Sequence, residues 1–355
     1  MHLVESPSRS ILLFEYELFG KPLSTFLDHA LAAREFCVKA AWTSIHLNVW
    51  DDVVATAARL FRGRGNRPKT VQLNSLSGSR LGGVVRPAAY TSKVRMNDHT
   101  IVALLATRGV EDFLQNALLG LAGAGINPRI VHVARPDSAG DAIDPVIRAA
   151  GAHVVSFSRF CDPSPDFTSE GYVEYGTPAF ISINWAKVRY LRWLLQQYRQ
   201  VVYADVDVAW LADPLWYLQA VGRHYPLAFQ TEAVRRFPPV CCWGFVSLMA
   251  TDDAQRLLNE LLAGHDNRPP GAEPLDEQAA CEALFTQDPG WMSRVYPLPE
   301  ALFLNGLSYR GLLPPPAAAV PMHGALTPFA FHANWTAGLE NKRALMMQTG
   351  TWLLK

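Results

Sequence analysis

The sequence has no excess of charge of either sign. Of its 355 residues, 32 are Lys or Arg and 32 are Asp or Glu, so the formal net charge is zero. Charged residues make up 18% and hydrophobic residues 49%, a composition typical of a globular protein and unlike that of a disordered chain. Because a neutral chain has no global field that attracts nucleic acid, we expect no nucleic-acid partner.

Cysteine and long apolar runs are also scarce. Five cysteines without a C-x-x-C pair argue against a disulfide framework or a zinc site and favour a reducing compartment. No uncharged apolar run reaches the length of a membrane span, and Glu5, Arg9, Glu15 and Glu17 interrupt the apolar N-terminal stretch. We therefore expect neither a membrane span nor a signal peptide. We expect a cytoplasmic protein.

Two regions differ in pattern. Residues 1–95 combine a helical pattern at 24–42 with a glycine-rich basic segment from Arg59 to Lys69, which predicts a helix-rich extension or cap of unknown role. We expect the basic segment to be a solvated loop, with an anionic surface or an acceptor site as the alternative. Residues 96–355 alternate apolar strands with amphipathic helices, which predicts an α/β domain with a mostly parallel sheet and flanking helices.

Two aspartates interrupt the apolar run at 201–208. Side chains at i and i+2 of a strand share a face, so Asp205 and Asp207 would repel each other unless a cation lies between them. They fall near the carboxyl end of a predicted strand, where open α/β sheets bind ligands. A divalent metal that holds the diphosphate of an activated sugar would resolve the repulsion, and Mg²⁺ or Mn²⁺ suits hard oxygen ligands.

Two other interpretations of the pair are open. One is a turn acid with a helix cap, although a cap needs only one carboxylate. The other is the nucleophile strand of a haloacid-dehalogenase-like phosphatase. That family expects its acidic segment downstream, whereas the similar segment here, at 140–144, lies upstream.

Four motifs in one order carry a family resemblance. The segments WAKVRYL with VVYADVDVAWLADPL, WGFVSLMAT, LDEQAACEALF and FHANWTAGLENKRALM resemble the nucleotide-diphospho-sugar transferase domain of glycosyltransferase family 77 and, more distantly, family 8. The resemblance covers residues 101–355. It implies a Rossmann-like GT-A fold and a metal-dependent transfer from a nucleotide-diphospho-sugar to an acceptor hydroxyl with retention of configuration. The acceptor, whether a glycan, a lipid-linked sugar or a protein, is not identified, and one at a membrane surface is a hypothesis.

The resemblance implies roles for the matching residues. Asp205, Asp207 and His332 are expected to hold the metal, with Mn²⁺ favoured over Mg²⁺. For His332, a satisfied core histidine is the alternative. Lys342 is expected to neutralise the departing diphosphate, with an exposed helix lysine as the alternative. Lys187 is expected to reach the nucleotide, with a surface position as the alternative.

The LDEQ segment departs from the family pattern because Glu277 separates the aspartate from the glutamine. Either Asp276 or Glu277 is expected to face the sugar, and Gln278 to contact sugar hydroxyls or the reacting centre. Gly244 and Phe245 fit a close backbone approach to donor or acceptor, with packing as the alternative.

Other candidates rest on position alone. Thr107 and Arg108 end the first predicted strand, where base and ribose usually lie in this architecture. Trp210, Trp243 and Trp335 flank the motifs, and we expect core packing for them, with stacking on sugar or base as the alternative. The rival functions are a phosphatase or nucleotide-sugar hydrolase and a catalytically inactive nucleotide-sugar-binding module.

Overall fold

The computed structural model describes residues 97–355 except 163–171, 233–237 and 308–327. The helix predicted at 24–42 and the basic segment from Arg59 to Lys69 lie outside the described residues. The predicted extension over 1–95 therefore stays a prediction.

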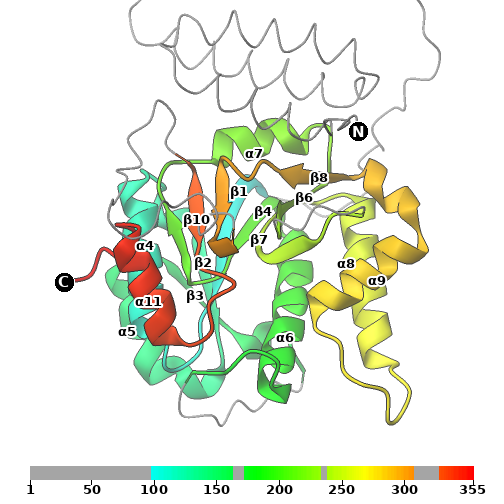
Figure 1. Ribbon diagram of the computed structural model, residues 1–355, viewed down its shortest axis with the longest axis horizontal. Coiled ribbons are helices and arrows are strands. Elements are labelled where there is room, and N and C mark those ends of the chain that lie inside the picture. The colour runs from blue at the N-terminus through cyan, green and yellow to red at the C-terminus, as the bar shows by residue number, and fades with distance from the viewer. Residues whose placement is uncertain (1–96, 163–171, 233–237, 308–327) are drawn as a thin grey trace, which may run out of the picture. The chain divides into compact units, whose positions relative to one another are not determined.

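A seven-stranded sheet forms the centre of the described part (Figure 1), with the strand order β3-β2-β1-β4-β7-β6-β8. Its strands are β1 (Asn97–Leu105), β2 (Val131–Arg135), β3 (His153–Ser156), β4 (Tyr198–Ala204), β6 (Leu227–Thr231), β7 (Cys241–Met249) and β8 (Val295–Leu298). Only the two pairs made by β7 are antiparallel, and the other four pairs of this sheet are parallel. The prediction of a mostly parallel sheet is confirmed.

Helices cover the sheet on both sides (Figure 1). One group contains α4 (Glu111–Gly123), α5 (Gly140–Ala149) and α11 (Leu339–Gln348), and the other contains α6 (Pro178–Leu195), α8 (Asp252–Asp266) and α9 (Glu277–Gln287). The described residues also contain α7 (Leu215–Gly222) and the short 3₁₀ turns η1 (Pro128–Ile130), η2 (Asp137–Ala139), η3 (Phe157–Arg159) and η4 (Pro289–Ser293). None of the helices in the described ranges is long and apolar enough to cross a membrane.

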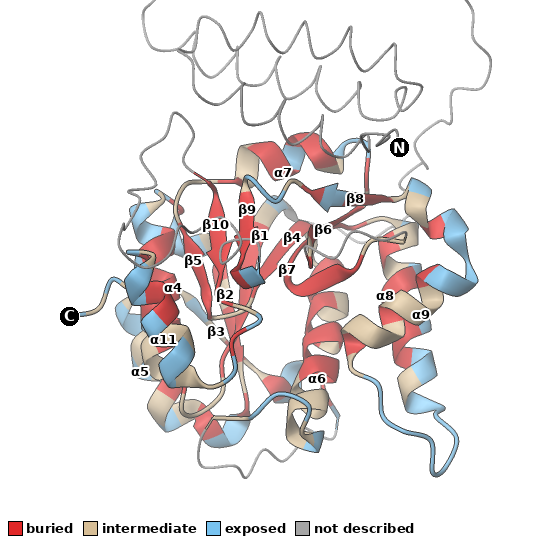
Figure 2. Cartoon of the chain, viewed as in Figure 1, coloured by how far each residue is buried: buried red, intermediate tan, exposed pale blue. Residues whose placement is uncertain are grey.

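The main core lies between the sheet and the helices α6, α8 and α9 (Figure 2). Every residue of β7 is buried, as expected for a central strand with both faces covered. Helix α6 begins after Thr177, whose side chain accepts a hydrogen bond from Phe180 N, and Pro178 takes its first position. The helix ends at Leu195, and β4 begins at Tyr198.

A second, three-stranded sheet has the order β5-β10-β9. Its strands are β5 (Val208–Trp210), β9 (Phe303–Asn305) and β10 (Ala330–His332). The strand predicted over 201–208 is wrong at its end, because β4 stops at Ala204 and a turn precedes β5. β10 pairs antiparallel with β5 and places His332 opposite Val208. The small sheet thereby brings His332 to the residue that follows Asp207.

Candidate metal and donor site

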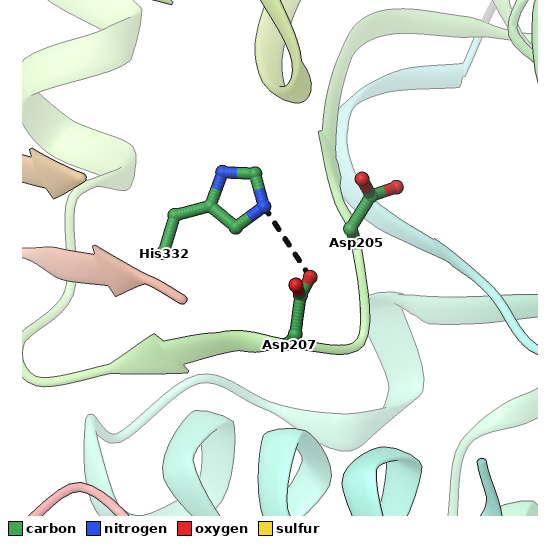
Figure 3. Close-up of side chains that lie close together, drawn as sticks. All are labelled: Asp205, Asp207 and His332. Atoms are coloured by element: carbon green, nitrogen blue, oxygen red, sulfur yellow. Dashed lines mark ion pairs between the residues drawn. The ribbon is translucent and has the colours of Figure 1, made fainter. Parts of the chain in front are cut away.

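Three side chains converge at the turn between β4 and β5. Asp205 and Asp207 lie in this turn, and His332 ends β10 (Figure 3). One ligand atom from each of the three lies within 4.8 Å of the others. The sequence predicted this group, but for the two aspartates it gave the wrong local geometry. A turn, and not one face of a strand, brings their carboxylates together.

Asp207 is buried and has two basic neighbours. Its Oδ1 lies 3.3 Å from His332 Nε2, and a dashed line joins the two side chains in Figure 3. Its Oδ2 accepts a hydrogen bond from Lys342 Nζ at 2.5 Å. Burial would raise the pKa of Asp207, but Lys342 and His332 outweigh it and hold this pKa far below its ordinary value. Burial likewise opposes the charge of Lys342, and Asp207 raises the pKa of Lys342. The alternative of an exposed helix lysine is therefore wrong.

Contacts between α11 and α4 fix Lys342 in place. In α11, Arg343 forms an ion pair with Asp112 of α4. The C-terminal tail is tied to the same helix, since Asn116 Nδ2 donates to Thr351 O at 3.1 Å. Lys342 thus projects from a helix that is tied to α4 by the next residue and by the tail that follows it.

Asp205 has a different set of partners. Its backbone N donates to Gly244 O at 2.9 Å, which continues the pairing of β4 with β7. Its Oδ1 accepts a hydrogen bond from Tyr203 Oη at 2.7 Å and lies 3.7 Å from Lys187 Nζ. The side chain of Asp205 stays about one third exposed, at 35%. It can therefore bind a ligand that approaches from solvent.

Lys187 lies inside the protein and not on its surface. Its side chain is 4% exposed, and its Nζ lies 2.7 Å from Glu277 Oε1. Although burial opposes its charge, Asp205 and Glu277 raise the pKa of Lys187 above the ordinary value. The alternative of a surface lysine is wrong. Besides Glu277, the Nζ of Lys187 contacts Trp243 O at 3.4 Å and Asp205 Oδ1 at 3.7 Å, so its contacts are all with the protein.

The structure separates the two acids of the LDEQ segment. Asp276 precedes α9 and caps it, since its Oδ1 accepts from Ala279 N at 2.7 Å. Glu277 is buried against Lys187, and its Oε2 has no hydrogen-bond partner among the described residues. Burial raises the pKa of Glu277, against the opposing charge of Lys187. Gln278 follows in the first turn of α9 and is partly buried.

Gly244 makes room for the site. A Cβ at this position would lie 2.2 Å from His332 Cε1 and 2.9 Å from Asp205 Oδ2. This close packing is against side chains of the protein, as the packing alternative expected, and the approach of Gly244 to donor or acceptor stays a prediction. Phe245 points into the core, where its ring packs against Trp210 and Phe303 at centroid distances of 5.5 and 5.1 Å.

The tryptophans divide into two kinds. Trp210 and Trp243 are buried, which confirms the expectation of core packing. Trp335 is 51% exposed, has a left-handed backbone with φ of 57°, and donates from Nε1 to the buried carboxylate of Glu232. Such backbone strain in a non-glycine residue is often found at functional sites. Of the three tryptophans, Trp335 alone has an exposed ring that can stack on a sugar or a base.

The structure places Arg108 beyond the end of β1, where it forms an ion pair with Asp141 of α5. Thr107 lies beside it at the sheet edge that also carries Asp205, because β1 and β4 are parallel neighbours. The segment at 140–144, compared above with a phosphatase motif, forms the start of α5. Its Asp144 pairs with Arg135 at 2.7 Å.

Sequence reasoning missed two polar residues. Gln230 and Glu232 lie in and just after β6, and both are buried. Gln230 Oε1 lies 2.9 Å from His332 Nδ1, and Asn334 Nδ2 donates weakly to Glu232 Oε2 at 3.5 Å. The one signal in the sequence is that an apolar strand, PLAFQ, ends in an amide followed within two residues by an acid.

The group Asp205, Asp207 and His332 fits a divalent cation. Two carboxylates and one imidazole nitrogen are ligands that Mn²⁺ and Mg²⁺ accept, and the remaining positions can take phosphate oxygens. The net charge of the site also fits a dication. Three carboxylates, those of Asp205, Asp207 and Glu277, carry three negative charges. The two lysines, Lys187 and Lys342, carry two positive charges. A dication would leave this network with one net positive charge, which suits a diphosphate.

Comparison with known proteins decides the family. A family model described as nucleotide-diphospho-sugar transferase matches residues 144–346, more than half of the chain. The chain belongs to this family. The transferase is a glycosyltransferase, and its α/β sheet with flanking helices is the fold class predicted from sequence. The match assigns no numbered family, so family 77 stays a prediction. A search of curated proteins finds no match.

Solved structures that resemble the transferase include three glycosyltransferases. The galactosyltransferase LgtC, solved with donor and acceptor sugar analogues, has 10% identity and a TM-score of 0.47, over 72% of this chain and 97% of LgtC. GlyE of Streptococcus pneumoniae has 12% identity and a TM-score of 0.43, over 72% and 62%. Mouse xyloside xylosyltransferase 1 has 10% identity and a TM-score of 0.43, over 66% and 98%.

Proposed function

We propose that this transferase moves a sugar from a nucleotide-diphospho-sugar to an acceptor hydroxyl in a metal-dependent reaction that retains the anomeric configuration. The observation that carries the proposal is the convergence of Asp205 and Asp207, from one turn, with His332, from the end of a strand far away in the chain. These residues would hold Mn²⁺ or Mg²⁺. When bound, the cation supplies positive charge to the diphosphate as it leaves.

Lys342 is proposed to stabilise the same leaving group. Its Nζ lies 2.5 Å from an oxygen of Asp207, so a diphosphate bound beside Asp207 lies within its reach. A lysine acts on phosphate as a point charge, and fixed charges aimed at developing negative charge are usually the largest catalytic contribution. Lys342 would then exchange its contact with Asp207 for one with the phosphate.

For the sugar we propose Glu277 and Gln278. The Glu277 carboxylate is the buried acid next to Asp205 and Lys187, whereas Asp276 is used as a helix cap. Lys187 is proposed to hold both carboxylates in place and not to bind the nucleotide directly. Gln278 would contact sugar hydroxyls, and Thr107 and Arg108 would lie near the base and ribose.

Retention requires the acceptor hydroxyl to attack from the face that the diphosphate leaves. The departing diphosphate can itself take the acceptor proton, so we assign no dedicated base. Acceptor binding is proposed to use the exposed face of Trp335, since a sugar ring stacks well on an indole. We propose that the transferase works in the cytoplasm and that its acceptor is a glycan, a lipid-linked sugar or a protein.

A thermal-shift panel tests the proposal. Nucleotide sugars are added together with Mn²⁺, Mg²⁺ or EDTA, and Tm is measured. A ligand that binds only the native state raises the stability of the protein by about 2.7 kcal/mol at a hundredfold excess over Kd. We expect one donor to raise Tm in the presence of metal and EDTA to abolish the shift. If no donor shifts Tm under any condition, the proposal is wrong. Release of free sugar at the same rate with and without acceptors would instead indicate a hydrolase.

A further inference from the structure

Gln230 connects the large sheet to the small one. It lies near the end of β6, where the pairing with β7 shifts register between Phe229 and Gln230. Its Nε2 donates to two backbone carbonyls of β9, Phe303 O at 3.1 Å and Leu304 O at 2.8 Å. Its Oε1 lies 2.9 Å from Nδ1 of His332 in β10. A single buried side chain therefore contacts both strands that form the His332 side of the site.

These contacts fix the orientation of the amide. A carbonyl oxygen only accepts hydrogen bonds, so the amide NH₂ of Gln230 has to face Phe303 and Leu304. The reverse orientation would place Oε1 against two carbonyl oxygens in the protein interior, at a high cost in free energy. The amide oxygen therefore faces His332, and Nδ1 of the imidazole has to carry the hydrogen. The other neighbour of Nδ1, Cys242 Sγ at 3.6 Å, is a weak partner.

This hydrogen decides the state of the opposite ring nitrogen. When Nδ1 of a neutral imidazole carries the hydrogen, Nε2 presents a lone pair. Nε2 of His332 lies 3.3 Å from Asp207 Oδ1, another electron-pair donor. Two lone pairs directed at each other are unfavourable unless a cation lies with them. The hydrogen bond from Nδ1 to Gln230 therefore prepares Nε2 to bind a cation.

We propose that Gln230 is a positioning residue that holds His332 in the Nδ1–H form, so that Nε2 is ready as a metal ligand before the metal arrives. The proposal rests on the metal-dependent function proposed above. Partners of this kind behind a metal-binding histidine fix its tautomer and ring orientation. Gln230 touches neither the candidate cation site nor a substrate directly, and acts through His332.

The first test needs no variant and no metal. The full chain is labelled with ¹⁵N-histidine, and long-range ¹H–¹⁵N spectra at pH 8 without metal report which ring nitrogen carries hydrogen. The His332 signal is assigned by its loss in His332→Gln. We expect hydrogen on Nδ1 of His332 and none on Nε2. A ring with hydrogen on Nε2, either alone or on both nitrogens, would overturn the proposal.

The second test compares two buried glutamines. Gln200 in β4 is equally buried, accepts from Thr100 Oγ1, and donates to Leu218 O and Ser247 Oγ, away from the metal site. Gln230→Met and Gln200→Met each replace a buried amide with an apolar side chain of similar length. Both variants should lower Tm. Calorimetric titration with Mn²⁺ alone should show an affinity about 10-fold to 100-fold weaker in Gln230→Met. In Gln200→Met the affinity should stay within about twofold of wild type. Equal Mn²⁺ affinity in wild type and Gln230→Met would overturn the proposal.

The two tests separate this inference from the proposed function. If wild type binds no Mn²⁺ and no donor, the metal-dependent function fails, and the tautomer of His332 alone decides the role of Gln230. If wild type binds Mn²⁺ and Gln230→Met binds it equally well, the function stands and the positioning role fails. If Gln230→Met does not fold, the wild-type spectrum still decides.

Discussion

Gly244 and His332 are packed so closely that a Cβ at position 244 would lie 2.2 Å from His332 Cε1. Real Cβ atoms do not approach a neighbour to this distance, so any other residue has to displace the imidazole or the strand. The same Cβ would meet Asp205 Oδ2 at 2.9 Å. Glycine is therefore required where β7 passes the two candidate metal ligands.

Gly244→Ala should impair the site more than the fold. The added methyl group displaces His332, so we expect Mn²⁺ affinity in calorimetric titration to fall at least about 10-fold, the scale found when a ligand's support is removed. Gly264→Ala is the matched control, because Gly264 lies inside α8 with no atom within 4 Å of an added Cβ. That control should raise stability by about 0.5–1 kcal/mol and leave Mn²⁺ affinity unchanged. Equal Mn²⁺ affinity in Gly244→Ala and wild type would contradict the site.

Lys342→Met should change two measurements in opposite directions. Without Lys342, Asp207 has lost its cationic partner, so Mn²⁺ alone should bind more tightly in a calorimetric titration. Transfer should slow by about 100-fold, the scale for the loss of one transition-state charge contact. Lys355→Met, at an exposed terminal residue, serves as the control. A transfer rate within twofold of wild type would remove Lys342 from the reaction.

The ion pair of Asp207 and Lys342 should make stability depend on pH in a defined window. Because the folded pKa of Asp207 is depressed, its stabilising contribution is complete above the unfolded pKa of about 3.9 and is lost as pH falls below it. Because the folded pKa of Lys342 is raised, the contribution of Lys342 to the free energy of unfolding is complete below the unfolded pKa of about 10.4. Because His332 also contacts Asp207 and an imidazole titrates in this range, the comparison is made with His332→Gln in both proteins. Urea unfolding of metal-free His332→Gln and of His332→Gln with Asp207→Asn should then differ by a constant free energy from pH 5 to 9, and this difference should narrow below pH 4. A difference that varies between pH 5 and 9 would argue against the pair.

Substitutions in the LDEQ segment should separate its two acids. Asp276→Ser keeps a residue that caps helices well, so transfer should stay within about twofold of wild type. Glu277→Gln keeps the shape and a partner for Lys187 but removes the buried charge, and the transfer rate should fall by about 100-fold. Initial rates at saturating donor, together with Tm, check both variants. If Asp276→Ser is the slower enzyme, the assignment of Glu277 is wrong.

The linear sequence predicted much of the fold and the centre of the site. Apolar strands alternating with amphipathic helices over residues 96–355 predicted the mostly parallel sheet with flanking helices, because burial on one or both faces sets the periodicity of each element. Asp205 and Asp207 were found because two charges inside an apolar run are conspicuous. His332 and Lys342 were found only because their motifs follow the others in a family order.

Tertiary structure decided the rest. Asp276 and Glu277 are neighbours in the sequence, and only the start of α9 shows that one caps the helix while the other reaches Lys187. Gln230 contacts His332 across a separation of 102 residues, through a register shift that no local pattern encodes. Periodicity reports which face of an element is buried. It does not report which distant strand supplies the neighbour, because that depends on how two sheets meet.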